Sequence, residues 1–369
     1  MTGERQGGGR HGGERQGGER TAIVLFNLGG PDGPAAVEPF LRNLFRDPAI
    51  LRVPGPVRAF LAWLIARRRA PVAREIYAQL GGGSPILPNT EAQARALETA
   101  LAGDGTFKCF IAMRYWHPRA AASAATVAAW KPTRLLLLPL YPQFSTTTTA
   151  SSLAEWDRVA GPAGLAGLPS HRLCCYPDEP GFVAELAARL APHLEAARAS
   201  GRPLRLLLSA HGLPKKIVAA GDPYQWQVER TAAAVKARLL ASGLAQSDLD
   251  LVVCYQSRVG PLEWIGPSTE SEVRRAGADK VALVVAPVAF VSEHSETLVE
   301  LDRELRHVAE QAGVASYHRA PTVDAGAAFI AGLARLVRDA LARGPLLAPD
   351  GGRRLCPASW GGCPCKESV

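Results

Sequence analysis

The chain predicts an α/β fold made of two similar units, each a parallel β-sheet flanked by helices. Short apolar runs alternate along the sequence with longer segments of helical periodicity, which is the order of elements in a layered parallel sheet. Runs such as 281–286, Val-Ala-Leu-Val-Val-Ala, are apolar at every position, as expected for strands covered on both faces. Both halves of the chain repeat this pattern, on either side of the segment 177–180.

The first half is expected to alternate strands and helices around two glycine-rich turns. Its strands are the apolar runs 22–28, 107–113 and 134–140. Its helices carry apolar residues on one side and cover 35–77, 89–102 and 119–130. Prolines 48, 54 and 56 break the first helical segment, because proline lacks the amide hydrogen that a helix interior needs. The glycine-rich turns at 29–34 and 81–85 let the backbone approach another group closely.

The second half repeats the alternation and ends in a tail. Its expected strands are 204–209, 249–255 and 281–286, with a short element near 315–317. Its expected helices are 181–199, 224–242, 269–276, 295–312 and 324–342. The predicted domains are therefore a first unit at 21–178 and a second unit at 179–345, between a tail at 1–20 and a cysteine-containing tail at 346–369. Residues 1–20 contain no apolar residue after Met1, so we expect this tail to be disordered.

Composition limits the class of protein. The net charge of +8 comes from scattered arginines rather than from one basic stripe, so nucleic acid is not an expected partner. No apolar run reaches the roughly 20 residues that cross a bilayer, and no secretory signal is visible, so a cytoplasmic location is expected. Seven cysteines in such a chain indicate metal or redox chemistry rather than a disulfide framework.

Two strand ends carry residues suited to proton transfer. His211 follows the strand at 204–209, and Glu296 follows the strand at 281–286. Ligands bind outside the carboxyl ends of strands in open α/β sheets, so these two side chains form a candidate site. Histidine suits proton transfer and metal binding equally well. A capping histidine in a turn and an acid at a helix start are the structural alternatives.

Further acids surround Glu296. Glu293 and His294 precede it, and Glu300 and Glu304 follow at intervals of four residues. A helix would align Glu296, Glu300 and Glu304 as a ladder of carboxylates. Such a ladder repels itself unless cations visit it, which favours a site over a simple helix start.

Aromatic and hydroxyl side chains also gather at strand ends. Arg114, Tyr115, Trp264 and Phe290 lie just after expected strands or in the loops that follow them. A flat apolar ligand that bears carboxylates would suit this lining, although each aromatic alone is more often a core residue. The loop 145–149, Ser-Thr-Thr-Thr-Thr, would either contact such a ligand or cap a helix.

The remaining candidates are cysteines. Cys356, Cys363 and Cys365 lie in a tail rich in glycine and proline, where thiols have no core to fill. Either Cys174 or Cys175 would supply a fourth ligand for a zinc or iron–sulfur site. Free surface thiols are the alternative.

Six motifs, in this order, make the chain resemble the ferrochelatase family. They are Asn-Leu-Gly-Gly-Pro at 27–31, Gly-Gly-Gly-Ser-Pro-Ile at 81–86, Leu-Tyr-Pro-Gln at 140–143, Ser-Ala-His-Gly-Leu-Pro at 209–214, Gln-Ser-Arg-Val-Gly-Pro at 256–261 and Ser-Glu-His-Ser-Glu-Thr-Leu at 292–298. The resemblance implies the chelatase fold, two Rossmann-like halves around a porphyrin cleft. It also implies a lyase that inserts Fe²⁺ into protoporphyrin IX in the last step of haem synthesis. Coproporphyrin as the substrate, a cobalt chelatase acting on a corrin precursor, and a tetrapyrrole carrier without activity are the alternatives.

The resemblance also implies roles for individual residues. His211 and Glu296 would handle iron and accept protons, with the division between them left open. The residues implied to bind substrate are Leu28, Ser84, Arg114, Tyr115, Trp264, Phe290, His294 and Glu300. Of these, Leu28 and the three aromatics would line the cleft, and Ser84 and Arg114 would contact propionates. The ladder of Glu296, Glu300 and Glu304 would relay protons or metal outward.

The cysteine tail is similar to that of bacterial relatives with a [2Fe–2S] cluster. Some relatives take a fourth ligand from the loop at 145–149, which has no cysteine here, so Cys174 or Cys175 would replace it. The apolar positions of segment 39–64 would contact lipid at the inner membrane or else pack on the core. The oligomeric state is open, and a homodimer is one of the options.

Overall fold

The computed structural model describes residues 18–244, 249–258, 260 and 262–365. Most of the N-terminal tail that we predict to be disordered lies outside these residues. The first described strand, β1 (Arg20–Asn27), begins at the last residue of that predicted tail. None of the helices in the described ranges combines the length and apolarity of a membrane span.

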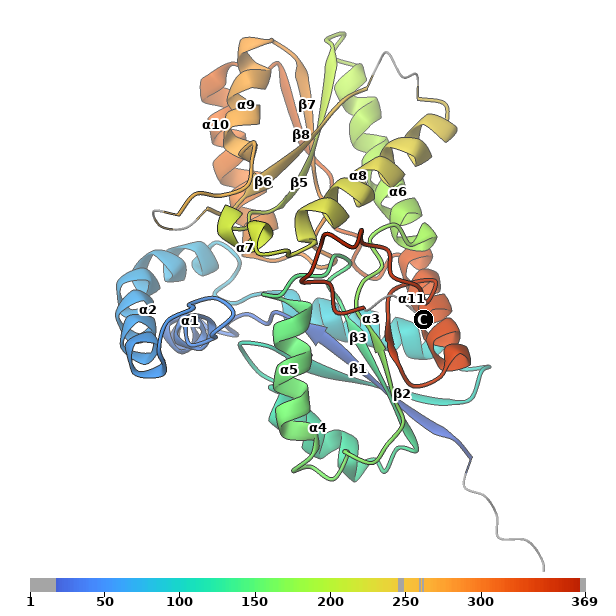
Figure 1. Cartoon of the computed structure of the whole chain (residues 1–369). Helices are drawn as coiled ribbons and strands as arrows, with labels where there is room; N and C mark the ends of the chain where they lie inside the picture. The colour runs from blue at the N-terminus through green and yellow to red at the C-terminus, as the bar shows by residue number, and fades with distance from the viewer. Residues whose placement is uncertain (1–17, 245–248, 259, 261, 366–369) are drawn as a thin grey trace, which may run out of the picture.

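Two parallel sheets form the molecule, one above the other in Figure 1. The first has the order β2-β1-β3-β4-β9, with β2 (Thr106–Met113), β3 (Arg134–Pro139), β4 (Ser170–Leu173) and β9 (Leu347–Ala348). The second has the order β6-β5-β7-β8, with β5 (Leu204–His211), β6 (Asp250–Gln256), β7 (Ala282–Pro287) and β8 (Ser316–Arg319). Every pairing in both sheets is parallel, which confirms the predicted fold class.

Helices cover both sheets. Those that follow strands of the first unit are α3 (Ile86–Ala100), α4 (Ala120–Ala129) and α5 (Thr149–Ala160). The second unit has α6 (Pro180–Arg198), α7 (Lys215–Ala219), α8 (Tyr224–Ala241), α9 (Thr269–Ala278), α10 (Leu305–Ala312) and α11 (Ala327–Arg343). Two further helices, α1 (Val37–Phe45) and α2 (Gly55–Ala78), stand beside the first sheet, and the break between them falls where prolines predict it (Figure 1).

One apolar core holds the two units together. It joins Ile23 and Leu136 of the first sheet to Leu206 and Val284 of the second through buried side chains of α6 and α11. Helix α11 packs against both α6 and α3. Strand β9 then pairs with β4, so the chain returns to the first sheet after completing the second.

The structure differs from the predicted elements in several places, and helix α7 is one that the sequence did not predict. The predicted helix at 295–312 begins as a π-helix at Glu296–Glu304 and becomes α10 afterwards. Strands β4 and β9 have four and two residues, which is too short for a run of apolar residues to stand out. Helix α5 begins in a stretch of threonine and serine, whose helix propensity is low.

Candidate active site

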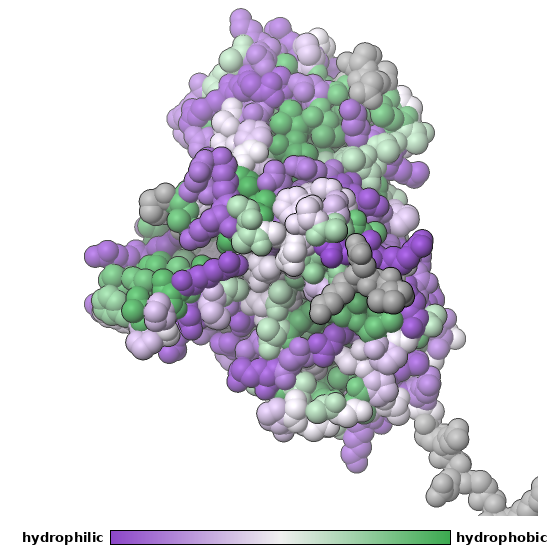
Figure 2. Space-filling view, viewed as in Figure 1, coloured by the Kyte–Doolittle hydropathy of each residue, from purple (hydrophilic) through white to green (hydrophobic). Residues whose placement is uncertain are grey.

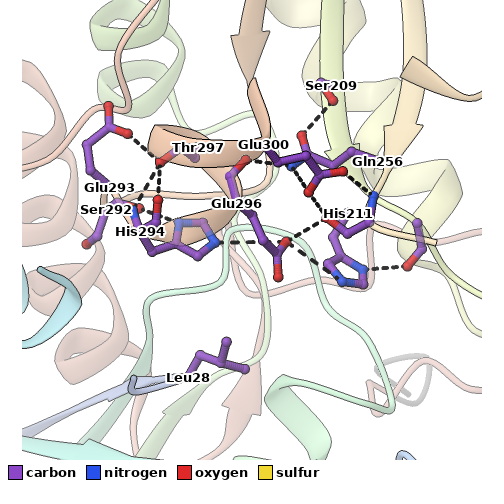
Figure 3. Close-up of polar contacts among 12 residues, drawn as sticks. Leu28, Ser209, His211, Gln256, Ser292, Glu293, His294, Glu296, Thr297 and Glu300 are labelled. Atoms are coloured by element: carbon purple, nitrogen blue, oxygen red, sulfur yellow. Dashed lines mark hydrogen bonds and ion pairs between the residues drawn. The ribbon is translucent and has the colours of Figure 1, made fainter. Parts of the chain in front are cut away.

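The candidate site lies at the carboxyl ends of β5 and β7. His211 is the last residue of β5, and Glu296 opens the π-helix that follows β7. The structure brings them together, with 3.8 Å between His211 Nε2 and Glu296 Oε2. His294 lies on the other side of the same carboxylate, with its Nε2 4.0 Å from Glu296 Oε2 (Figure 3).

Two contacts fix the position of His211. A Cβ on Gly212 would come within 2.9 Å of the Gln256 carbonyl oxygen and 3.1 Å of the Trp264 ring, so only glycine fits directly after the histidine. The Tyr224 hydroxyl donates a hydrogen bond of 3.1 Å to the His211 carbonyl oxygen. The turn that holds the imidazole is therefore closely packed on both sides.

The two histidines turn their Nε2 atoms toward Glu296. His211 Nδ1 lies within hydrogen-bond distance of the Gly212 carbonyl oxygen, and His294 Nδ1 lies 3.2 Å from the Ser292 carbonyl oxygen. Carbonyl oxygens only accept, so each Nδ1 carries a hydrogen, and the neutral form of each ring has its lone pair on Nε2. Burial lowers the pKa of His294, which favours its neutral form although Glu296 opposes the effect. An unprotonated Nε2 on either ring is an acceptor beside the Glu296 carboxylate, and a proton or a metal cation there would be attracted to both groups.

A second carboxylate, that of Glu300, lies close to Glu296. Glu300 accepts hydrogen bonds from the Ser257 amide (2.8 Å), the Ser257 hydroxyl and the Gln256 side chain (3.3 Å). The same Ser257 hydroxyl lies 3.1 Å from Glu296 Oε2, so it connects the two carboxylates. Burial raises the pKa of Glu300, and the charge of Glu296 raises it further. The predicted ladder is limited to this pair, because Glu304 is exposed.

The loop with His294 is anchored by an ion pair that sequence reasoning missed. Arg319, the last residue of β8, pairs with Glu293 and with Asp302. Glu293 also accepts hydrogen bonds from the Thr322 amide (2.9 Å) and from the Thr297 hydroxyl. In the sequence, Arg319 is only a charged residue at the end of a short strand, and nothing in the local pattern reveals its partners.

Apolar side chains flank His211, His294 and Glu296. The Phe290 ring lies 4.5 Å from the His294 ring, and the Trp264 ring lies 6.5 Å from that of His211, centroid to centroid. The Trp264 indole nitrogen is buried and has no hydrogen-bond partner among the described residues. Leu28, directly after β1, lies across from the Glu296 carboxylate, which points toward it (Figure 3).

The other predicted substrate residues, Arg114, Tyr115 and Ser84, make their contacts within the first unit. Arg114 pairs with buried Asp47, at 2.8 Å between Nη2 and Oδ2, and its Nε donates to the Ser151 hydroxyl at 2.7 Å. Tyr115 is fully buried, and its hydroxyl donates to the same Asp47 carboxylate at 2.8 Å. Ser84 packs against Gly30, where an added Cβ would lie 2.5 Å from the serine Cβ. Asp47 is thus a further residue that sequence reasoning missed.

The predicted cysteines also meet. Cys174 Sγ lies 3.3 Å from Cys365 Sγ and 3.6 Å from Cys175 Sγ. The Gln227 amide nitrogen donates to Cys356 Sγ at 3.1 Å and to Cys175 Sγ at 3.5 Å. Contacts with Cys356 and then Cys365 lower the pKa of Cys363 to about 3. In the described part of the chain, no three His, Cys, Asp or Glu side chains have the arrangement of a ready metal site.

The raised pKa of Glu300 predicts a pH-dependent stability. The folded state binds the Glu300 proton more tightly than the unfolded chain, whose pKa is near the ordinary 4.5. The stability that this proton contributes is complete below pH 4.5 and is lost as pH rises through the raised pKa. Glu300→Gln cannot ionise, so its free energy of unfolding relative to the native chain should rise over that range.

Urea unfolding at several pH values between about 4.5 and about 8 measures this difference. Glu304→Gln removes an exposed carboxylate from the same π-helix and is the control for the loss of one charge. Parallel stability curves for Glu300→Gln and the native chain would contradict the prediction.

Comparison with known proteins agrees with this geometry. Residues 20–341 match the family model described as Ferrochelatase. Ferrochelatases of Caulobacter vibrioides and Phenylobacterium zucineum are 51% and 52% identical, each over 94% of this chain and 98% of the relative. The solved structure of SirB from Bacillus subtilis with Fe³⁺ has a TM-score of 0.51 and 13% identity, over 88% of this chain and 96% of SirB, and so shares the fold. The chain belongs to the ferrochelatase family.

Proposed function

We propose that this chain inserts Fe²⁺ into protoporphyrin, the last step of haem synthesis, and that His211, Glu296 and His294 carry the reaction. The family membership supports the activity. The observation that carries the assignment of residues is the convergence of two imidazole nitrogens on one carboxylate oxygen, at 3.8 and 4.0 Å.

The chemistry requires an exchange of cations. A free porphyrin carries two pyrrole N–H protons that leave as Fe²⁺ enters. Neutral imidazole and carboxylate oxygen are ligands of Fe²⁺ and are also bases. We propose that the substrate iron is first held by these groups and that the lone pairs it vacates then accept the two protons. The charge of the site is the same before and after this exchange.

The protons then need a route away from the ring. The His211 side chain is 41% exposed and that of His294 is 7% exposed, so His211 is the imidazole that a porphyrin can approach. A proton on His211 Nε2 lies next to Glu296, and the Ser257 hydroxyl leads from Glu296 to Glu300. The raised pKa of Glu300 suits it to receive that proton.

Apolar side chains on two sides of the site would hold the macrocycle. We assign Trp264 and Phe290 on one side and Leu28 on the other to its apolar faces, where a tight fit can bend the ring and expose its nitrogen lone pairs. Ser84 and Arg114 remain our candidates for the propionates. Arg114 already pairs with Asp47, so it would have to bind a propionate in addition to that carboxylate. The hydroxyl of buried Tyr115 donates to the same Asp47 carboxylate.

The substitution His211→Ala tests the catalytic assignment. We expect the loss of turnover by at least about 100-fold, the range in which a general base contributes, while porphyrin binding is kept. Purified protein is mixed with Fe²⁺ and protoporphyrin IX, and the Soret shift and porphyrin fluorescence report turnover and binding. His307→Ala, at an exposed position of α10, is the control.

Retained turnover in His211→Ala would refute the role of this residue. The same assay with coproporphyrin, or with Co²⁺ in place of Fe²⁺, separates the alternative substrates. Tight porphyrin binding without turnover in the native chain would favour a carrier.

We also propose that Cys356, Cys363 and Cys365 bind a [2Fe–2S] cluster with Cys174 as the fourth ligand and Cys175 as its alternative. Thiolates are the ligands of such clusters, and the distance of 3.3 Å between Cys174 Sγ and Cys365 Sγ brings two of the proposed ligands together. The Gln227 amide, which donates to two of the sulfurs, would stabilise their negative charge. When bound, a cluster of this kind would supply a one-electron redox centre that links the tail to the body of the protein.

The cluster proposal predicts a colour. Protein purified without oxygen should be red-brown, and Cys363→Ser should remove the visible absorbance because one ligand is lost. Cys109→Ser, which changes a thiol on β2, should leave the absorbance unchanged. Colourless native protein with stoichiometric zinc would refute the cluster.

We propose that α2 contacts the surface of the inner membrane. The inner side of α2 packs through Ala62, Ala66 and Ala70, whereas Phe60 and Trp63 are 59% and 40% exposed. Arginines 67–69 follow on the same helix, and Figure 2 shows the apolar patch over α2. An exposed apolar face beside cationic residues is typical of helices that lie in the interface of an anionic bilayer.

Flotation with liposomes that contain anionic phospholipid measures this contact. We expect the native chain to float with the vesicles and the double substitution Phe60→Ser, Trp63→Ser to remain at the bottom, because the exposed apolar area is lost. Leu262→Ser removes an exposed apolar side chain elsewhere and should not change flotation. Equal flotation of the native and double-substituted chains would contradict the prediction.

A further inference from the structure

The hydroxyl-rich loop at 145–149 contacts a buried carboxylate of the other unit. Asp222, between α7 and α8, is 1% exposed. Its Oδ2 accepts three hydrogen bonds from the loop: from Ser145 Oγ at 2.9 Å, from the Thr146 amide at 2.7 Å and from Thr146 Oγ1 at 2.7 Å. Its Oδ1 accepts the Tyr224 amide at 3.0 Å. The loop belongs to the first unit and Asp222 to the second, so this group of hydrogen bonds joins the units.

The connection continues to the active site. Tyr224, whose amide bonds to Asp222, donates its hydroxyl to the carbonyl oxygen of His211 at 3.1 Å. On the other side, Arg52 of the α1–α2 connection donates to Thr146 Oγ1 at 3.4 Å. Four residues, Arg52, Thr146, Asp222 and Tyr224, thus connect the α1–α2 segment to the strand end that holds His211.

Other interdomain bonds support the opposite side of the site. Gln93 of α3 donates to the carbonyl oxygens of Val291 and Asp324, at 2.9 and 3.0 Å. Gln143 donates to the carbonyl oxygen of Val288 at 3.0 Å. These bonds hold the segment that leads to Glu296, whereas the bonds of Asp222 hold the segment next to His211.

We propose that Asp222 is a positioning residue that fixes the His211 side of the cleft relative to the Leu28 side. The proposal rests on the proposed function, because it assumes that the porphyrin binds between these two walls. Hydrogen bonds to a buried carboxylate are stronger than those between neutral groups, since the charge has no water to solvate it. The separation of the walls, and with it the affinity for the flat substrate, therefore depends on Asp222.

The substitution Asp222→Asn tests the proposal. An amide has one accepting oxygen, so whichever way it is oriented at least one of the four donors loses its partner. We expect the KM for porphyrin to rise roughly tenfold, the effect of losing a hydrogen bond to a charged group, with a smaller change in kcat. Hydrogen exchange at the Thr146 amide should become faster. Asp157→Asn, which removes a surface carboxylate paired with Arg172, should leave both measurements unchanged.

Thr146→Val gives a second measurement that keeps the Asp222 charge. It removes one donor but retains the backbone amide, so a smaller rise in KM is expected. If the two residues act through each other, the effect of the double substitution on KM is smaller than the product of the single effects. Thr146→Val alone serves as the test if Asp222→Asn does not fold. A native KM and native hydrogen exchange at the amide of residue 146 would then overturn the proposal.

The outcomes separate the positioning role from the activity. A folded Asp222→Asn protein with native KM, or single effects that multiply independently, would overturn the role of Asp222. Absence of turnover in the native chain would instead refute the proposed function, and the exchange of the Thr146 amide would still report whether Asp222 joins the units.

Discussion

The site depends on two imidazoles and one carboxylate that the fold brings together. His211 and His294 give their Nδ1 hydrogens to backbone carbonyls and direct their Nε2 atoms at Glu296. When both rings are neutral, the three groups are all acceptors and do not attract one another, so the fold has to hold them in place. The attraction for a cation that results from this arrangement is what metal insertion requires.

The surrounding structure supplies the restraint. Gly212 lets the turn after β5 pack against Trp264, and the ion pair of Glu293 with Arg319 holds the loop that carries His294. The π-helix places Glu296 and Glu300 where one hydroxyl of Ser257 contacts both. Ser257 itself has a positive φ of 63°, an uncommon conformation for a residue with a side chain. The backbone at Ser257 thus adopts an uncommon conformation at the point where its hydroxyl contacts both carboxylates.

Much of the fold and the centre of the site could be predicted from the sequence. Fully apolar runs identify the central strands because buried parallel strands have no polar face, and the titratable residues at their ends mark His211 and Glu296. Strands as short as β4 and β9 carry too little local pattern, since their pairing is decided by tertiary contacts. The pairs of Arg114 with Asp47 and of Ser145 with Asp222 join residues 67 and 77 positions apart, and nothing in the local sequence identifies such partners. The predicted role of the loop 145–149 as a ligand contact or cap left out its contact with the second unit for the same reason.

The path of the chain through the two sheets has a consequence for biosynthesis. Helix α11 and strand β9, which pack on the first unit, follow the second sheet in the sequence. A nascent polypeptide can pair β1 with β2 and β3 early, but the edge of that sheet beside β4 stays open until β9 has been synthesised. The Cys174 thiol likewise meets that of Cys365 only after the second unit has been made. Completion of the first sheet is thus coupled to synthesis of the whole second unit.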